Sequence, residues 1–165
     1  MIYTALALGT GWLSGAILFY SIHRWVFHSK KNSFAYKFLF HKYNPLRWLA
    51  RKGRKIHISH HKETFKYGPS VTEHMNIFFP LWAKVFTGTV VLGSAFVFGA
   101  APTIGLVSFF PFYAYRHKKA HELYHKDDRR PWVAHHMSHH TDDPQSNFSG
   151  TVPAIDKVFG TYKKQ

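Results

Sequence analysis

Two long stretches of the chain are almost free of charged side chains, a pattern typical of helices that cross a membrane. Residues 2–22 contain no charged residue, and between Ile77 and Tyr115 only Lys84 is charged. A helix crosses a hydrocarbon core of about 30 Å with about 20 apolar residues. The sequence Gly99-Ala100-Ala101-Pro102 interrupts the second stretch near its middle, so we predict a helical hairpin there. The predicted membrane spans are roughly residues 2–22, 77–98 and 103–118.

Each stretch also has an alternative interpretation. A secretory signal peptide would resemble residues 2–22, but it would carry a basic segment before its apolar part, and none is found here. The central stretch could instead form a pair of buried core helices in a soluble protein. Because both hydrophobic lengths match the thickness of a bilayer, we favour retained membrane helices.

The segment between the two apolar stretches has the opposite character. Residues 24–66 carry twelve Lys or Arg residues and a single acid, Glu63, mixed with aromatic side chains. Alternating basic and apolar positions favour an amphipathic helix in the plane of the lipid headgroups. The pair Asn44-Pro45 is expected to break that helix.

The segment from Arg116 to Gln165 is polar and rich in histidine, and residues 116–130 add six more Lys or Arg residues. If the central stretch is a hairpin, this segment and residues 24–66 lie on the same side of the membrane. Both are basic, so the positive-inside rule assigns them to the cytoplasm. We therefore expect one all-α domain over residues 1–165: an integral membrane protein with about three spans, an interfacial amphipathic helix and a cytoplasmic histidine-rich helical cap.

Composition narrows the possible chemistry. The 165 residues include no cysteine, which excludes disulfides, thiolate-ligated zinc and iron–sulfur clusters, so a bound metal would need nitrogen or oxygen ligands. The formal net charge of +14 indicates an anionic partner. Nucleic-acid binding would explain the charge but neither the apolar stretches nor the histidine spacing, so we expect a membrane partner and no nucleic acid.

The 14 histidines fall mainly into four clusters, and only His41 and His74 lie outside them. Residues three or four apart share one face of a helix, so several of these imidazoles should converge. His23 and His28 are five apart, about 140° around a helix, and would converge only if the helix ends or distorts there. The clusters are His23 and His28; His57, His60 and His61; His117, His121 and His125; and His135, His136, His139 and His140.

Clustered imidazoles at these spacings favour a transition-metal site, because neutral imidazole binds iron, zinc and copper. A metal-buffering tract is the compositional alternative, but such tracts usually lie in low-complexity loops. A ferritin-like carboxylate di-iron bundle needs two Glu-x-x-His motifs and two further glutamates. The chain has three glutamates in all, and only Glu122 with His125 fits that motif, so this alternative fails.

The order H-x4-H, H-x2-H-H, H-x3-H, H-x2-H-H resembles the fatty acid hydroxylase superfamily of membrane histidine-box di-iron oxygenases. The form H-R-W-V-F-H of the first box, the gap between His121 and His125, and the ending D-K-V-F-G-T-Y are most similar to fatty acid 2-hydroxylases. The likeness runs from His23 to Tyr162. It implies ten metal ligands: His23, His28, His57, His60, His61, His121, His125, His136, His139 and His140.

The resemblance also implies two non-haem iron ions on the cytoplasmic face and O2 as co-substrate. The expected substrate is a fatty acyl chain or sphingolipid. The chain departs from the family pattern in having three predicted spans where four are usual, and it lacks a fused cytochrome b5 module. Electrons are therefore expected from a separate cytochrome b5 or ferredoxin with its reductase. His117 and His135 have no counterpart in the pattern, so either could replace a neighbour.

Other functions remain open on the residues alone. A carotenoid or sterol hydroxylase or desaturase of the same superfamily is one, and a non-catalytic membrane metal-binding or transport protein is another. Ionisable residues are expected within the spans of a transporter, and these spans carry almost none. Lys55 and Arg54 are candidates for holding an anionic substrate. The candidate carboxylates for orienting the ligands are Glu63, Glu122, Asp142 and Asp143.

Overall fold

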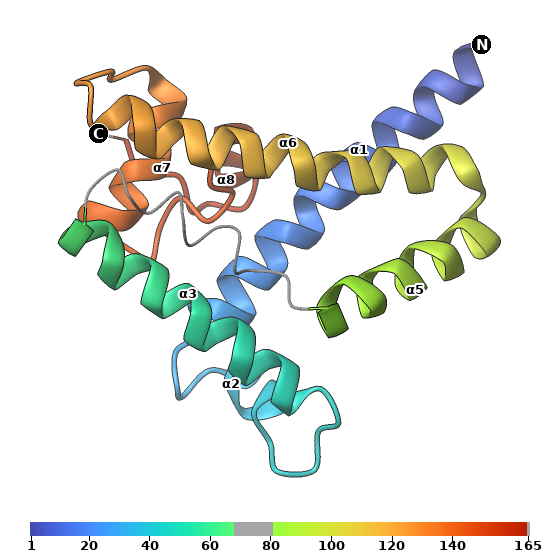
Figure 1. Ribbon diagram of the computed structural model, residues 1–165, viewed down its shortest axis with the longest axis horizontal. Coiled ribbons are helices and arrows are strands. Elements are labelled where there is room, and N and C mark those ends of the chain that lie inside the picture. The colour runs from blue at the N-terminus through green and yellow to red at the C-terminus, as the bar shows by residue number, and fades with distance from the viewer. Residues whose placement is uncertain (68–80, 165) are drawn as a thin grey trace.

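The computed structural model describes residues 1–67 and 81–164, and within them every regular element is a helix (Figure 1). The predicted all-α class is therefore confirmed for this part of the chain. The elements are α1 (Ile2–Ile22), the π-helix η1 (His23–Phe27), α2 (Phe34–Leu39), α3 (Arg47–Tyr67), α5 (Leu81–Phe98), α6 (Ala100–Tyr124), α7 (Pro131–Thr141) and α8 (Pro153–Val158).

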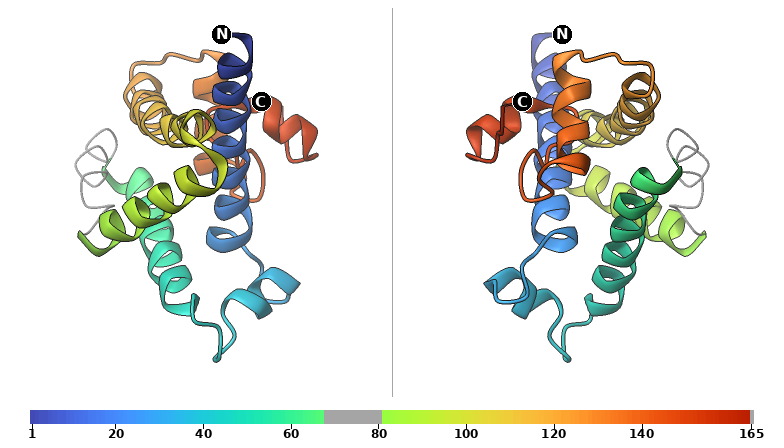
Figure 2. Two further views of the ribbon diagram at one scale, coloured as in Figure 1. Left: turned by 90° about the vertical axis from the view of Figure 1, so that its right-hand side faces the viewer. Right: turned by 90° about the vertical axis from the view of Figure 1, so that its left-hand side faces the viewer.

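Helices α1 and α6 cross in close contact, and glycines make this approach possible (Figures 1 and 2). A Cβ atom on Gly11 would lie 2.0 Å from the main-chain oxygen of Pro102, and one on Gly105 would lie 2.1 Å from that of Leu8. At Gly15 the corresponding distance, to the oxygen of Leu106, is 2.6 Å. Such small-residue contacts are common between helices in membranes, where the backbones gain dispersion energy by approaching closely.

Beside these glycine contacts, aromatic rings fill the space between α1 and α6. Trp12 meets the ring of Phe109 edge-on at 5.2 Å, and Phe19 lies 3.9 Å from the ring of Tyr113. Phe109 is 1% exposed, so this is the apolar core. The chain leaves this core at the carboxyl ends of both helices, where the histidines begin.

The predicted helical pair is present as α5 and α6, which contact each other and join at Gly99, with φ of 87°. The boundaries differ from the prediction, since α6 begins at Ala100 and continues to Tyr124 rather than spanning 103–118. Pro102 lies in the first turn, where a missing N–H costs nothing, so it does not delay the start of the helix. Of the predicted span 77–98, residues 77–80 lie outside the described part of the chain.

By length and composition, one helix of the described residues suffices to cross a membrane: α1 with its continuation to Phe27. Only 17% of its most apolar window is buried, so most of this apolar helix surface is exposed. Helix α5 offers a shorter apolar run, Gly88–Phe98, and the last turns of α6 are charged. The predicted count of three spans is thus not confirmed.

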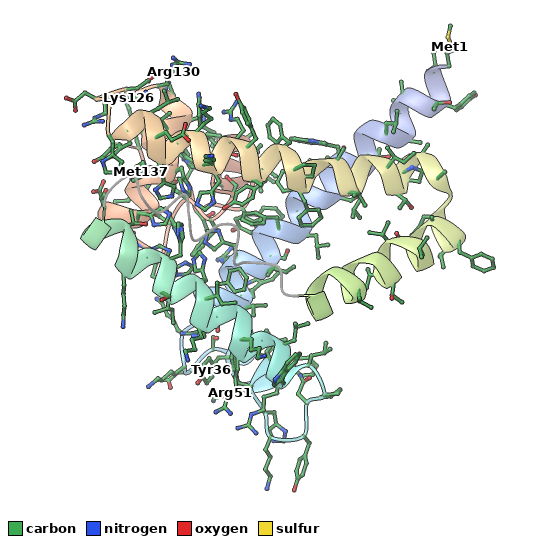
Figure 3. All side chains as sticks on the ribbon, in the orientation of Figure 1. Met1, Tyr36, Arg51, Lys126, Arg130 and Met137 are labelled. Atoms are coloured by element: carbon green, nitrogen blue, oxygen red, sulfur yellow. The ribbon has the colours of Figure 1, made fainter. Side chains whose placement is uncertain are left out.

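Helix α3 is amphipathic, as predicted for the basic segment. His57, His60 and Ala50 are buried on one side, whereas Lys52 and Lys55 are exposed on the other. The break expected at Asn44-Pro45 is found between α2 and α3. In Figure 3, Met1 marks the apolar end of α1, far from Lys126 and Arg130 at the polar end of the molecule.

Candidate metal centre

Histidines of η1, α3, α6 and α7, together with His28 directly after η1, converge in the space between α3, α6 and α7, where Figure 3 shows side-chain nitrogen atoms gathered near Met137. They form two neighbouring groups, and within each the potential ligand atoms all lie within 4.8 Å of one another. Group A comprises His23, His28, His57, His61 and His139, and group B comprises His60, His117, His121 and His140.

The π-helix η1 brings the first two of these histidines together. The backbone N–H of His28 donates to the carbonyl of His23 at 3.1 Å, a five-residue hydrogen bond that widens the turn. The two rings consequently lie 5.0 Å apart between centroids, although an α-helix would separate them by about 140°. The prediction that these residues converge only through a distorted helix end is confirmed.

Two helices each contribute to both groups. His57 and His61 of α3 belong to group A, whereas His60 belongs to group B. On α7, His139 belongs to group A and His140 to group B. The groups are therefore adjacent, and the rings of His61 and His140 lie 4.3 Å apart.

In group A, three other nitrogens surround one ring nitrogen. The Nε2 atom of His57 lies 3.1 Å from that of His23, 2.7 Å from that of His28 and 3.0 Å from that of His61. An imidazole nitrogen carries either one proton or one lone pair, so it cannot make three hydrogen bonds. Nitrogens bound at about 2.1 Å to one ion with right angles between them would lie about 3.0 Å apart, which matches these distances.

Group B shows a similar arrangement. The Nε2 atom of His117 lies 3.1 Å from that of His60 and 3.1 Å from that of His121. His136 borders this group, because its Nε2 atom is 3.2 Å from those of His121 and His140. Both sets of donors thus fit a transition-metal ion with imidazole ligands.

Main-chain carbonyls fix the tautomers of two ligands in group A. The Nδ1–H of His23 donates to the carbonyl of Phe148, and that of His139 donates to the carbonyl of Ser146 at 2.7 Å. A carbonyl only accepts, so the proton stays on Nδ1 and Nε2 keeps its lone pair. The Nε2 atom of His139 is buried and has no hydrogen-bond partner among the described residues, as expected for an atom that binds a metal.

Burial keeps these imidazoles neutral. Loss of water, together with neighbouring histidines, lowers the pKa of His28 to about 2 and that of His61 to about 3. Burial likewise lowers the pKa of His121 and of His139 to about 4. Neutral imidazole is the form that binds metal, so the site is ready to bind at pH 7 without first losing protons.

Eight of the ten predicted ligands lie in the two groups, and a ninth, His136, borders group B. The tenth, His125, is exposed at the residue that follows the last turn of α6. His117, one turn before His121 on the buried side of α6, takes the expected place of His125. The spacing H-x3-H occurs twice in H-K-K-A-H-E-L-Y-H, so the sequence alone could not separate these two pairings.

The remaining histidines lie elsewhere. His135 is buried, but its Nε2–H donates to Asp156 at 3.0 Å and its ring stacks on Tyr162. His41 is exposed, and His74 lies outside the described residues.

The predicted orienting carboxylates do not contact the histidine groups in the described structure. Glu122 pairs with Lys119 at 2.8 Å, Asp142 contacts Thr141, and Asp143 pairs with Lys163. The side chain of Glu63 is outside the described part. For His23 and His139 the orienting acceptors are main-chain carbonyls, which sequence analysis missed because a carbonyl has no residue-type signature.

Asp156, which lies in the ending D-K-V-F-G-T-Y, anchors the carboxyl-terminal segment. Its buried carboxylate accepts hydrogen bonds from His135, from the backbone N–H of Ser149 and from the hydroxyl of Thr161. Burial alone would raise the pKa of Asp156, but these three hydrogen bonds outweigh it and lower the pKa. Thr161 also contacts the Tyr20 hydroxyl at 3.0 Å, so this segment is tied to α1 beside His23.

Arg54, a candidate for holding an anionic substrate, donates from Nη1 to the hydroxyl and the main-chain carbonyl of Ser29. Lys55 lies in an exposed groove on the outer side of α3 with other basic side chains and one tryptophan. The residues that line this groove are Arg47, Trp48, Arg51, Lys52 and Lys55.

Comparisons with protein-family models, with curated proteins and with solved structures gave no match to this chain.

Proposed function

We propose that this protein is a membrane-embedded non-haem di-metal oxygenase that hydroxylates a lipid. The observation that carries the proposal is the pair of adjacent histidine groups, whose Nε2 atoms crowd together in a way that hydrogen bonds cannot explain. Two neighbouring positions with imidazole-only ligands are suited to iron, and the histidine-box order resembles the fatty acid hydroxylase superfamily.

Two iron ions bound in these groups would supply the activation of O2 that attack on an unactivated C–H bond requires. In the balanced reaction, one oxygen atom enters the C–H bond and the other leaves as water, using two electrons and two protons from an external donor. The chain itself holds the donor set in its neutral form by burial and orients His23 and His139 through carbonyls. Phe148, 2% exposed, and Phe27 place apolar rings against His23 and His57 of group A.

Exposed apolar side chains support the membrane assignment. Leu6 on α1 is 60% exposed, and on α5 Leu92 and Phe96 are 75% and 94% exposed. A soluble monomer rarely exposes so much contiguous apolar surface. Basic residues of α3 and of the α6–α7 connection flank the grouped histidines in the sequence, and the positive-inside rule would assign these segments to the cytoplasm.

The substrate we propose is a fatty acyl chain, free or in a sphingolipid, which would reach the histidine groups from the bilayer. Electrons would come from a soluble or membrane-bound donor such as cytochrome b5 or a ferredoxin with its reductase. Two other functions compete with this one. A carotenoid or sterol hydroxylase or desaturase would use the same metal groups, and a non-catalytic metal-binding protein would bind metal without changing lipids.

The test is expression in a host membrane, followed by metal analysis of the purified protein and mass spectrometry of the host lipids. We expect about two metal ions per chain and lipids heavier by one oxygen atom. The variant with His60→Ala and His139→Ala, one ligand from each group, should lose both. The matched control changes His41→Ala and His125→Ala, two exposed histidines outside the groups, and should retain both.

The outcomes separate the competing functions. Lipids lighter by two hydrogens would indicate a desaturase. Metal bound without any lipid change, in a host that also expresses a reductase with cytochrome b5 or ferredoxin, would favour the non-catalytic protein. Well-folded protein without metal would refute the proposal.

A further inference from the structure

The two histidine groups differ in what holds the second nitrogen of each ring. In group A, Nδ1–H of His23 and of His139 donates to a main-chain carbonyl. In group B, the Nδ1 atoms of His121 and His140 are buried and find no hydrogen-bond partner in the described part of the chain. The same holds for Nδ1 of His136, which borders group B.

This difference affects metal binding. A ligating imidazole usually donates its other N–H to an acceptor, and loss of that acceptor typically weakens metal binding by about 10–100-fold. In group A the tautomer and ring orientation of two ligands are fixed before an ion arrives. In group B no acceptor fixes the tautomer of His121 or His140, so their tautomers are set only on binding, which costs free energy and lowers affinity.

One short loop makes the difference, and Asn147 is its centre. The two accepting carbonyls belong to Ser146 and Phe148, on either side of Asn147, which has φ of 54°. The buried Asn147 side chain donates to Ser138 Oγ at 2.8 Å, and its Oδ1 accepts from the backbone N–H of Lys163 at 2.8 Å. These bonds attach the loop to α7 and to the carboxyl-terminal segment.

We propose that group A is the tight metal position, filled before group B, and that Asn147 is the positioning residue that sets its affinity. This inference rests on the proposed function only in that both groups bind metal.

The test is a titration of Co²⁺ into the chelator-treated protein in detergent. Calorimetry and visible absorption measure each binding step. We expect two binding steps with dissociation constants at least about tenfold apart. His139→Ala should weaken the tight step and His140→Ala the weak one, although these residues are neighbours on α7. Two equal steps in the unmodified protein, or loss of the weak step alone in His139→Ala, would overturn the order.

Asn147→Gly tests the positioning role, because glycine adopts the left-handed backbone without strain but removes all three side-chain hydrogen bonds, to Ser138 and to the main-chain N–H and carbonyl of Lys163. We expect the tight step to weaken by about 10–100-fold while the weak step changes by less than about twofold. Asn147→Asp keeps the oxygen that accepts from the backbone N–H of Lys163 but loses the amide donor. The affinity of its tight step should therefore lie between those of the unmodified protein and Asn147→Gly. Asn32→Gly, at an exposed turn, is the control and should change neither step.

The possible failures are distinguishable. If Asn147→Gly weakens both steps equally, the residue has a general structural role and the positioning role is wrong. If the unmodified protein binds Co²⁺ in two equal steps, the order is wrong while the di-metal proposal stands. If it binds no Co²⁺ at all, the proposed function fails as well.

Discussion

Arg54 on α3 binds Ser29, just beyond the π-helix, through two hydrogen bonds of 2.9 Å, one to the main-chain carbonyl and one to the hydroxyl. A third, longer bond of 3.4 Å reaches the carbonyl of Val26. The guanidinium thus satisfies carbonyls at the end of the distorted helix and joins α3 to the segment that carries His28. This side chain therefore has a structural role through its Nη1 atom.

Arg54→Met should destabilise the protein, because it removes the guanidinium partner of these carbonyls while keeping an apolar stem. Hydrogen bonds to charged groups contribute about 1.5–3 kcal/mol, so we expect the melting temperature in detergent to fall by about 4–8 °C. Lys55→Met, exposed on the same helix, is the control and should change it by less than about 2 °C. Equal melting temperatures for the two variants would contradict the role of Arg54.

The choice between His117 and His125 can be tested by counting metal ions. His117→Ala removes an imidazole from group B, so purified protein should contain about one metal ion fewer than the unmodified chain. His125→Ala alters an exposed residue and should leave the metal content unchanged. Elemental analysis of both variants decides the matter, and the reverse result would show that α6 ends differently in the metal-bound protein.

The metal-free protein should be sensitive to acid. An unfolded histidine binds a proton below about pH 6.5, whereas the pKa of His61 in the fold is about 3 and that of His139 about 4. Below pH 6.5 the unfolded chain therefore binds more protons than the folded one, and the free energy of unfolding decreases as the pH falls. Each such histidine costs up to about 1.4 kcal/mol per pH unit.

Four histidines with this property, His28, His61, His121 and His139, would together remove about 6 kcal/mol over one pH unit, comparable with the stability of a typical domain. We therefore expect the metal-free protein to unfold between about pH 5 and 6, as followed by circular dichroism. A melting temperature that stays constant from pH 8 to pH 5 would refute the neutral, buried state of these imidazoles.

Gly105→Ala should separate α1 from α6. The added Cβ would lie 2.1 Å from the carbonyl oxygen of Leu8, and a backbone atom can yield only if the helices move apart. Such overpacking costs about 1–3 kcal/mol, so we expect a melting temperature lower by several degrees. Gly9→Ala on α1 has nothing within 4 Å of its new Cβ and should be neutral or slightly stabilising. Thermal unfolding of the two variants in the same detergent makes the comparison.

Much of this architecture could be predicted because it depends on periodicity. The apolar stretch before His23, the break at Asn44-Pro45 and the shared face of His57, His60 and His61 follow from local spacing alone. Spacing could not distribute these histidines between two groups, because that depends on how α3 crosses α7. Nor could it choose His117 over His125, since both lie four residues from His121.

The contacts that orient His23 and His139 could not be predicted from the sequence for a different reason. Phe148 and Ser146 act through main-chain oxygens, and any residue would supply the same atom. What distinguishes the loop is the left-handed backbone of Asn147, and the identity of one asparagine is a weak indication of that conformation. Carboxylates such as Glu122 were favoured by their nearness in sequence, although they pair with surface lysines instead.

Helices α3 and α7 each place consecutive histidines, His60 with His61 and His139 with His140, in different groups. Consecutive residues of a helix are offset by a fixed 1.5 Å along its axis and about 100° around it. The offset between the two histidine groups therefore follows from regular helix geometry on α3 and α7 at once. A change in the separation of the backbones that carry the two groups would require both helices to bend, so the fold itself spaces the two candidate positions.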